Sequence, residues 1–163
     1  IMVFTAEEVW QSRFEGETES IHLQTYHAIP EDWCNEALAK KWEKIRKLRR
    51  VVTGALEVER REKRIGSSLQ GQATVYVRDP AYMDVMKNID LAELSITSAA
   101  QIVVGEAPTG AFIHEDVPDI AVVSTLAVGQ KCERCWQVLP TVGTVAGHDD
   151  ICPRCAEAVE RAE

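Results

Sequence analysis

Four cysteines near the end of the sequence are the residues best suited to chemistry. They form two CxxC pairs, sixteen residues apart, within the stretch KCERCWQVLPTVGTVAGHDDICPRC. Zn²⁺ prefers four soft ligands in a tetrahedron, and each CxxC turn supplies one edge of it. The spacing predicts one zinc site with the ligands Cys132, Cys135, Cys152 and Cys155. Two local disulfides or a redox-active CxxC are the alternatives, and the presence of two pairs argues against them.

The predicted zinc is structural, because four protein thiolates leave no open coordination position for catalysis. We therefore interpret His148 as a loop residue beside the site, and Cys34, which stands alone, as a packing residue. Clustered thiols in a chain with five cysteines favour a metal in a reducing compartment, so we expect a cytoplasmic protein.

Three residues around the cysteines could contact RNA. Arg134 lies inside the first CxxC, Trp136 follows it, and Arg154 lies inside the second. Arginine pairs with phosphate as a planar fork, and an exposed tryptophan can stack on an unpaired base. The alternative is that Trp136 packs over the zinc site or against the preceding module.

The elements that must carry this cluster include one strongly basic helix. The formal charge is −8, yet residues 36–64 hold eleven Lys/Arg against five Glu. Such a helix can bind a polyanion, and RNA phosphate is the natural partner. The residues expected on its basic face are Lys40, Lys44, Lys47 and Arg50. The alternative is an ordinary solvated face stabilised by pairs such as Glu43 with Lys47.

Apolar residues at three- and four-residue steps from Leu38 to Leu56 predict that this helix, over about 35–64, buries one stripe. We expect further helices to cover the stripe, and Gly66 to close the helix. A shorter helix is expected to begin near Thr5, with Glu8 in capping-box spacing. The other expected elements are a short strand or an extended segment at 20–26, strands at 73–77, 99–105 and 120–129, and short helices at 80–88 and 153–160.

These elements predict an α+β chain of three parts. Residues 1–66 form part of a helical bundle with one long basic helix, 67–128 a small α+β subdomain, and 129–163 a zinc ribbon. No apolar run approaches 18 residues, so we predict no membrane span. The opening IMVF has no initiator Met and no signal peptide, and we expect a piece of a longer protein.

The chain resembles the C-terminal part of bacterial isoleucyl-tRNA synthetases. The CxRCW…CxRC pattern, with a VG…H sequence between the pairs, is similar to their terminal zinc module, and the earlier stretches are similar to the end of their helical anticodon-binding domain. The stretches that carry the resemblance are Phe4–Trp10, Ile29–Trp33, Lys41–Val77 and Lys131–Cys155.

The resemblance implies a parent ligase that activates isoleucine with ATP, loads it onto tRNA(Ile) and hydrolyses mischarged valine. The HIGH and KMSKS signatures of the catalytic domain do not occur in these residues, so we expect no catalytic or editing site here. The four cysteines take the zinc-ligand role, and Trp136 takes the place of the family's aromatic residue beside the anticodon. The implied partners are the anticodon stem-loop and the catalytic and editing domains of the same chain, in a monomer.

Two other functions remain open on the sequence alone. A DNA-repair glycosylase has a zinc finger of similar cysteine spacing, although this chain has no comparable Gly-Arg-rich finger loop. A protein-interaction module stapled by zinc is the second alternative.

Overall fold

The computed structural model describes residues 2–14 and 20–161 and divides them into two compact units, at residues 1–36 and 37–163. The first unit contains α1 (Val3–Arg13) and the short 3-10 helices η1 (Ile21–Leu23) and η2 (Glu31–Trp33). The predicted helix at the N-terminus is confirmed, but its expected capping box is wrong, because the helix already begins at Val3 and no side chain caps it. The segment expected to be extended at 20–26 begins with η1, which Ser20 caps through its side chain.

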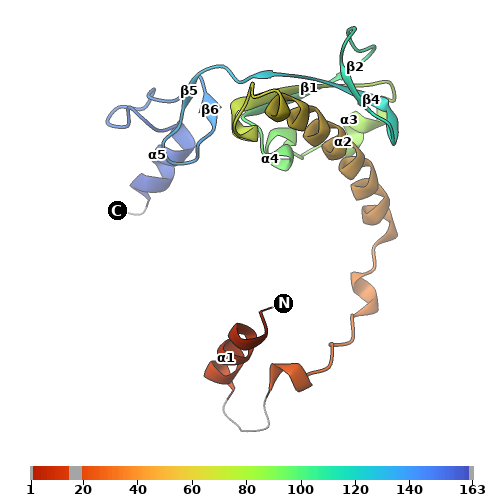
Figure 1. Cartoon of the computed structure of the whole chain (residues 1–163), viewed down its shortest axis with the longest axis vertical. Helices are drawn as coiled ribbons and strands as arrows, with labels where there is room; N and C mark the ends of the chain where they lie inside the picture. Colours follow the sequence, from red (N-terminus) through yellow and green to blue (C-terminus); the bar gives the residue numbers. More distant parts are fainter. Residues whose placement is uncertain (1, 15–19, 162–163) are drawn as a thin grey trace. The chain divides into compact units, whose positions relative to one another are not determined.

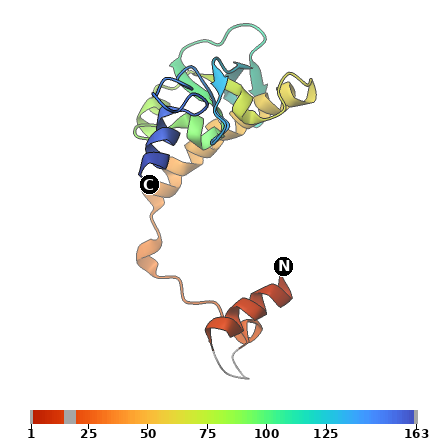
Figure 2. The ribbon, with the colours of Figure 1, turned by 90° about the vertical axis from the view of Figure 1, so that its left-hand side faces the viewer.

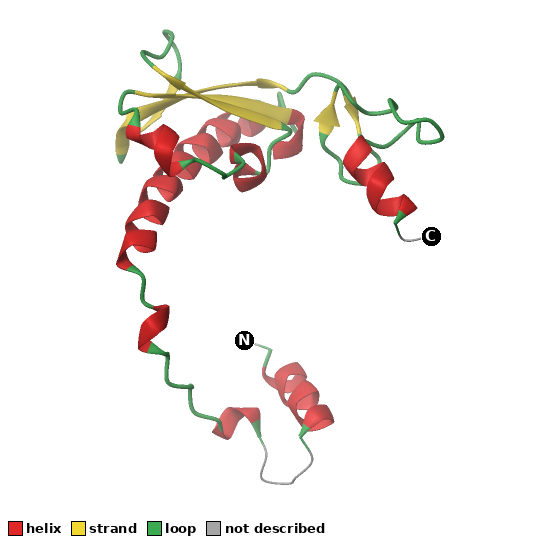
Figure 3. Cartoon of the chain, turned by 180° about the vertical axis from the view of Figure 1, so that it is seen from behind, coloured by secondary structure: helices red, strands yellow, loops and turns green. Residues whose placement is uncertain are grey.

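The larger part of the second unit is a four-stranded sheet with helices on one face (Figure 1; Figure 3). The strand order is β2-β1-β4-β3, with β1 parallel to β2 and antiparallel to β4. The strands are β1 (Gly71–Val77), β2 (Ala99–Val104), β3 (Phe112–His114) and β4 (Val117–Leu126). The helices are α2 (Glu36–Arg61), η3 (Ser68–Gln70), α3 (Ala81–Val85) and α4 (Leu91–Ser95). The predicted α+β class is confirmed.

The apolar stripe of α2 packs on the sheet from Ile45 to Leu56, whereas Leu38 and Trp42 at its start are exposed. Ile45, Leu48 and Val52 are fully buried in one core with Val75 and Val77 of β1. Residues of β1 alternate between this core and the opposite face, as expected for a strand with one covered side. The expectation that further helices cover the stripe is therefore only partly right for these residues, since a sheet buries the same face together with Tyr82 of α3 and Leu91 of α4.

The long helix ends without the predicted glycine cap. Lys63 adopts the left-handed conformation at φ 59°, its N–H donates to Arg60 O, and the N–H of Arg64 donates to Glu59 O. These two bonds are the Schellman pattern, in which one left-handed residue satisfies the last carbonyls of a helix. Gly66 therefore does not close the helix, and the turn ends three residues earlier.

A separate module follows the sheet, and we call residues 129–161 the zinc module and residues 37–128 the α+β module. The zinc module contains β5 (Gln130–Lys131), β6 (Val138–Leu139) and α5 (Pro153–Glu160), and Figure 2 shows it facing the viewer. Its buried residues form a cluster distinct from the core of the α+β module. The domain boundaries predicted at 66 and 128 stay predictions. The residues on either side of position 66 share one core, because α2 packs on the sheet. None of the described helices is long and apolar enough to cross a membrane.

Candidate metal centre and the residues around it

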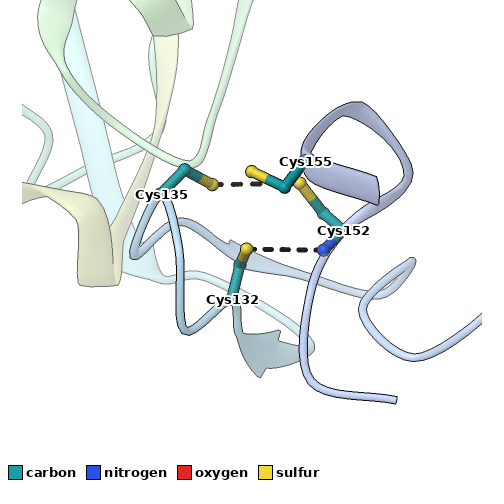
Figure 4. Close-up of side chains that lie close together, drawn as sticks. All are labelled: Cys132, Cys135, Cys152 and Cys155. Carbon is teal, nitrogen blue, oxygen red and sulfur yellow. Dashed lines mark hydrogen bonds between the residues drawn. The ribbon is translucent and has the colours of Figure 1, made fainter. Parts of the chain in front are cut away.

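The first CxxC pair lies in a tight turn between β5 and β6. The N–H of Trp136 donates to Cys132 O at 2.8 Å, and the N–H of Cys132 donates to Gln137 O at 2.8 Å. The turn therefore closes on itself through the backbone, which fixes both cysteines with their sulfurs on the inner side (Figure 4).

The second CxxC pair lies at the start of α5. Pro153 occupies the first turn of the helix, where a missing N–H costs nothing. The N–H of Cys155 donates to Cys152 O at 2.9 Å, so helix geometry brings the second thiol beside the first. The N–H of Cys152 also donates to the sulfur of Cys132 at 3.3 Å, which joins the two pairs.

The geometry of the four thiols suits a tetrahedral zinc. Their sulfurs all lie within 4.8 Å of one another, and Cys135 Sγ and Cys152 Sγ are 3.8 Å apart. A ZnS₄ tetrahedron with Zn–S bonds of ~2.3 Å has edges of ~3.8 Å. Cys132, Cys152 and Cys155 are buried and Cys135 is partly exposed. Four sulfurs complete the coordination, so the arrangement can hold a metal but offers no place for a reacting ligand.

Two of the thiols differ strongly in acidity. Burial opposes ionisation of Cys132, but backbone N–H groups of Cys135, Cys152 and Arg134 outweigh it and lower the pKa of Cys132 to about 6. Burial raises the pKa of Cys152 to about 11. Thiols so close together cannot all ionise alone, so a bound Zn²⁺ would displace their protons and supply the compensating charge.

Two arginines stand beside the sulfurs. Arg134 Nη1 lies 3.7 Å from Cys155 Sγ. A hydrogen bond to Cys135 raises the pKa of Arg154, and Arg154 Nη2 also donates to Gln137 Oε1 at 3.5 Å. A zinc with four thiolates carries a net charge of −2, which two guanidinium groups would offset. Gln137 was not singled out in the sequence, because only the folded turn brings its amide to the cluster.

Trp136 projects from the metal turn into solvent. The residue is 61% exposed and its backbone is left-handed at φ 65°. Lys131 Nζ lies 5.7 Å from the centre of its ring, a distance at which a cation and an aromatic face attract each other. The structure contradicts the interpretation in which the indole is packed over the zinc site.

The basic face of α2 is partly engaged with acidic side chains. Lys44 pairs with Asp79 at 3.8 Å and lies 5.6 Å from the ring centre of Tyr82. Lys47 pairs with Glu43 at 3.3 Å. Two further residues complete the predicted face: Arg50 pairs with Asp116 at 3.2 Å, and Lys40 is exposed. These are exposed pairs, which contribute little and can exchange an acid for a phosphate.

Two other predictions about single residues have different outcomes. His148 lies outside the group of four close sulfurs and pairs with Glu160 at 3.4 Å, in line with its interpretation as a loop residue. Cys34, predicted to pack, is exposed.

Comparison with known families assigns both ends of the chain. Residues 1–77 match the family "Anticodon-binding domain of tRNA ligase", and residues 129–158 match "Zinc finger found in FPG and IleRS". The zinc-finger match and the four close cysteines confirm the prediction of one structural zinc site.

Curated relatives match over the whole chain. An isoleucine–tRNA ligase of Bartonella henselae is 42% identical over 163 residues, which is 100% of this chain and 17% of the relative. The corresponding ligases of Agrobacterium fabrum and Bradyrhizobium diazoefficiens are 45% and 43% identical over 159 residues, 98% of this chain and 16% of each relative. The chain thus spans about one sixth of the length of these relatives.

Proposed function

We propose that this chain, which belongs to the isoleucine–tRNA ligase family, is the part of such a ligase that holds the anticodon stem-loop of tRNA(Ile). The observation that carries the proposal is Trp136, an exposed indole fixed on a zinc turn and backed by Lys131. Single-stranded RNA is read largely by stacking of splayed bases on such rings.

The proposed zinc ligands are the four clustered cysteines, Cys132, Cys135, Cys152 and Cys155. In this role zinc only fixes the turn, and the chain's own residues meet the RNA. The closed turn between β5 and β6 holds the backbone of Trp136, so stacking costs little ordering of the protein.

The positive residues are proposed to contribute unequally. Arg134 and Arg154 lie beside the sulfurs, so their first role is to offset the thiolate charge, and RNA contact is secondary. Lys40, Lys44, Lys47 and Arg50 would contact phosphates from α2, and their present ion pairs are weak enough to exchange.

The whole ligase would activate isoleucine with ATP, aminoacylate tRNA(Ile) and edit mischarged valine, with catalysis and editing in other segments of the same chain. We propose that it acts as a monomer in the cytoplasm, where reducing conditions keep cysteines available for zinc. The catalytic and editing domains are then the protein partners of this segment.

The test is a titration at fixed salt of the zinc-loaded chain with three nucleic acids. These are an isoleucine anticodon stem-loop, the same stem with a changed anticodon, and a DNA duplex carrying a lesion. We expect preference for the first, and Trp136→Ala should weaken it by ~1–3 kcal/mol, the usual contribution of one base–aromatic stack. Trp136→Phe should retain part of the affinity because it keeps a ring.

Ile113→Ala is the control, because Ile113 is also exposed but lies outside both the zinc module and the residues that match the anticodon-binding family. Equal losses at Ile113 and Trp136 would refute a special role of the zinc turn. Preference for lesion-bearing DNA would favour the glycosylase alternative.

A further inference from the structure

The zinc module is attached to the α+β module by more than the connecting chain. Ser98, which lies just before β2, is 6% exposed. Its hydroxyl donates to Leu69 O at 2.5 Å and accepts from the N–H of Val138 at 2.7 Å. Val138 belongs to β6 and lies two residues after Trp136. One hydroxyl thus joins the loop that follows α2 to the strand that follows the exposed indole.

The acceptor side of this joint is itself fixed. Ser67 and Gln70 form a capping box around η3, so the segment containing Leu69 is closed by its own side chains. Gly71 O accepts from the N–H of Ser98 at 3.1 Å, and Gln70 O accepts from the N–H of Ala127 at 2.8 Å. The loop at 67–71 therefore holds both the start of β2 and the end of β4.

The connecting chain also contacts the same strand. Gly129 has φ 124°, and a Cβ placed there would lie 2.1 Å from the carbonyl carbon of Leu139. No side chain fits at such a distance, so the backbones of Gly129 and Leu139 meet directly. Residues 138–139 are thus held both by the Ser98 hydroxyl and by the backbone of the connecting chain.

We propose that Ser98 is a positioning residue that fixes the zinc module on the α+β module, so that Trp136 keeps a constant place relative to α2. The consequence for RNA rests on the proposed function, because two contact points bind one stem-loop well only when their spacing is set beforehand. Without the hydroxyl, the N–H of Val138 and the carbonyl of Leu69 lose their shared partner, which favours opening of the joint.

The test uses Ser98→Ala in the zinc-loaded full chain, with Ser95→Ala as a matched control. Ser95 is 3% exposed, and its Oγ has no hydrogen-bond partner among the described residues. The two variants thus make the same buried change three residues apart, and only one removes the joint. If Ser98→Ala does not fold, Ser98→Cys replaces it, because a thiol is close in size to the hydroxyl but is only a weak hydrogen-bond donor and acceptor.

Two measurements report on the joint without RNA. Hydrogen exchange of the Val138 amide should accelerate about tenfold or more in Ser98→Ala, as expected when a buried N–H loses its partner. Residual dipolar couplings should show the two modules tumbling with one alignment in the parent and with different alignments in the variant. Ser95→Ala should match the parent in both. Unchanged Val138 exchange and a single alignment in Ser98→Ala would overturn the proposal.

A third measurement links the joint to the stem-loop. At unchanged zinc content, Ser98→Ala should lower stem-loop affinity about fivefold or more, and Ser95→Ala should not. Unchanged affinity with separated alignments would overturn the part of the proposal that concerns Trp136. If the parent itself does not bind the stem-loop, the proposed function fails, and the exchange and coupling data still decide the role of Ser98.

Discussion

The α+β module and the zinc module fill their interiors by different means. In the first, a helix stripe and one face of a sheet bury apolar side chains such as Leu48, Val52 and Val75 completely. In the second, three of the six buried residues are cysteines, and the other three are Val142, Ile151 and Ala156. A module of about thirty residues buries too little apolar surface to fold by that means alone. We therefore expect apolar packing to stabilise the α+β module and bound zinc to stabilise the zinc module.

Removal of zinc should have the largest effect, and it should unfold the zinc module while the α+β module stays folded. Structural zinc in small finger peptides contributes an apparent ~10–16 kcal/mol, because binding and folding are one event. A chelator should therefore abolish amide protection across residues 129–161 and leave the strands of the α+β module protected. Hydrogen exchange with and without chelator measures both modules in one sample. Retained protection in residues 129–161 without metal would contradict the contrast.

Loss of packing in the other module should have the next largest effect. Leu48 is fully buried between α2 and the sheet, so Leu48→Ala should reduce the free energy of unfolding of the α+β module by ~2–5 kcal/mol. Zinc content should stay at one per chain, because the cysteines lie outside this core. Urea denaturation followed by circular dichroism, with zinc analysis of the folded protein, measures both quantities.

The matched control for that change is Leu126→Ala. Leu126 ends β4 and is 60% exposed, so its truncation removes little buried surface and should cost a small fraction of the Leu48 effect. Similar losses at both positions, or loss of zinc in Leu48→Ala, would show that the two modules do not have separate sources of stability.

The same contrast explains how much could be predicted from sequence. The zinc site follows from cysteine spacing, and α5 was predicted at its observed bounds because Pro153 and the CxxC mark its start. Local signals of this kind need no knowledge of distant residues. The sheet that covers the buried part of the α2 stripe was not predicted, since an apolar helix face fits a sheet as well as another helix. The pattern alone does not distinguish them.

Features that depend on distant contacts were also missed. The three-residue strand β3 and the two-residue strands β5 and β6 are too short for a repeating pattern, and they form because they pair with other strands. The role of Ser98 has no local sequence signal, because its partner Val138 lies forty positions away. The helix end at Lys63 was missed because a left-handed lysine carries no sequence signal comparable to glycine.

The smallest expected effect concerns the backbone of Trp136. It tests whether this residue lowers the stability of the zinc module. A residue other than glycine rarely adopts φ 65°, and that conformation costs ~1 kcal/mol or slightly more. Trp136→Gly should relieve this strain and stabilise the zinc module by up to ~1 kcal/mol, reduced by the greater freedom of glycine in the unfolded chain. The same variant should lose stem-loop affinity. These two results together would show that Trp136 lowers the stability of the zinc module but is needed for binding the stem-loop.

Trp136→Ala isolates the backbone contribution, because alanine removes the indole and its contact with Lys131 but keeps the Cβ that makes the left-handed conformation costly. The glycine variant should therefore open less readily than the alanine variant, as measured by hydrogen exchange of the amides of residues 132–138 with zinc bound. Both should bind the stem-loop equally weakly, since neither has a ring to stack. Equal opening of the two variants would mean that the zinc turn holds Trp136 without backbone strain, and that its exposure has no measurable cost to the module.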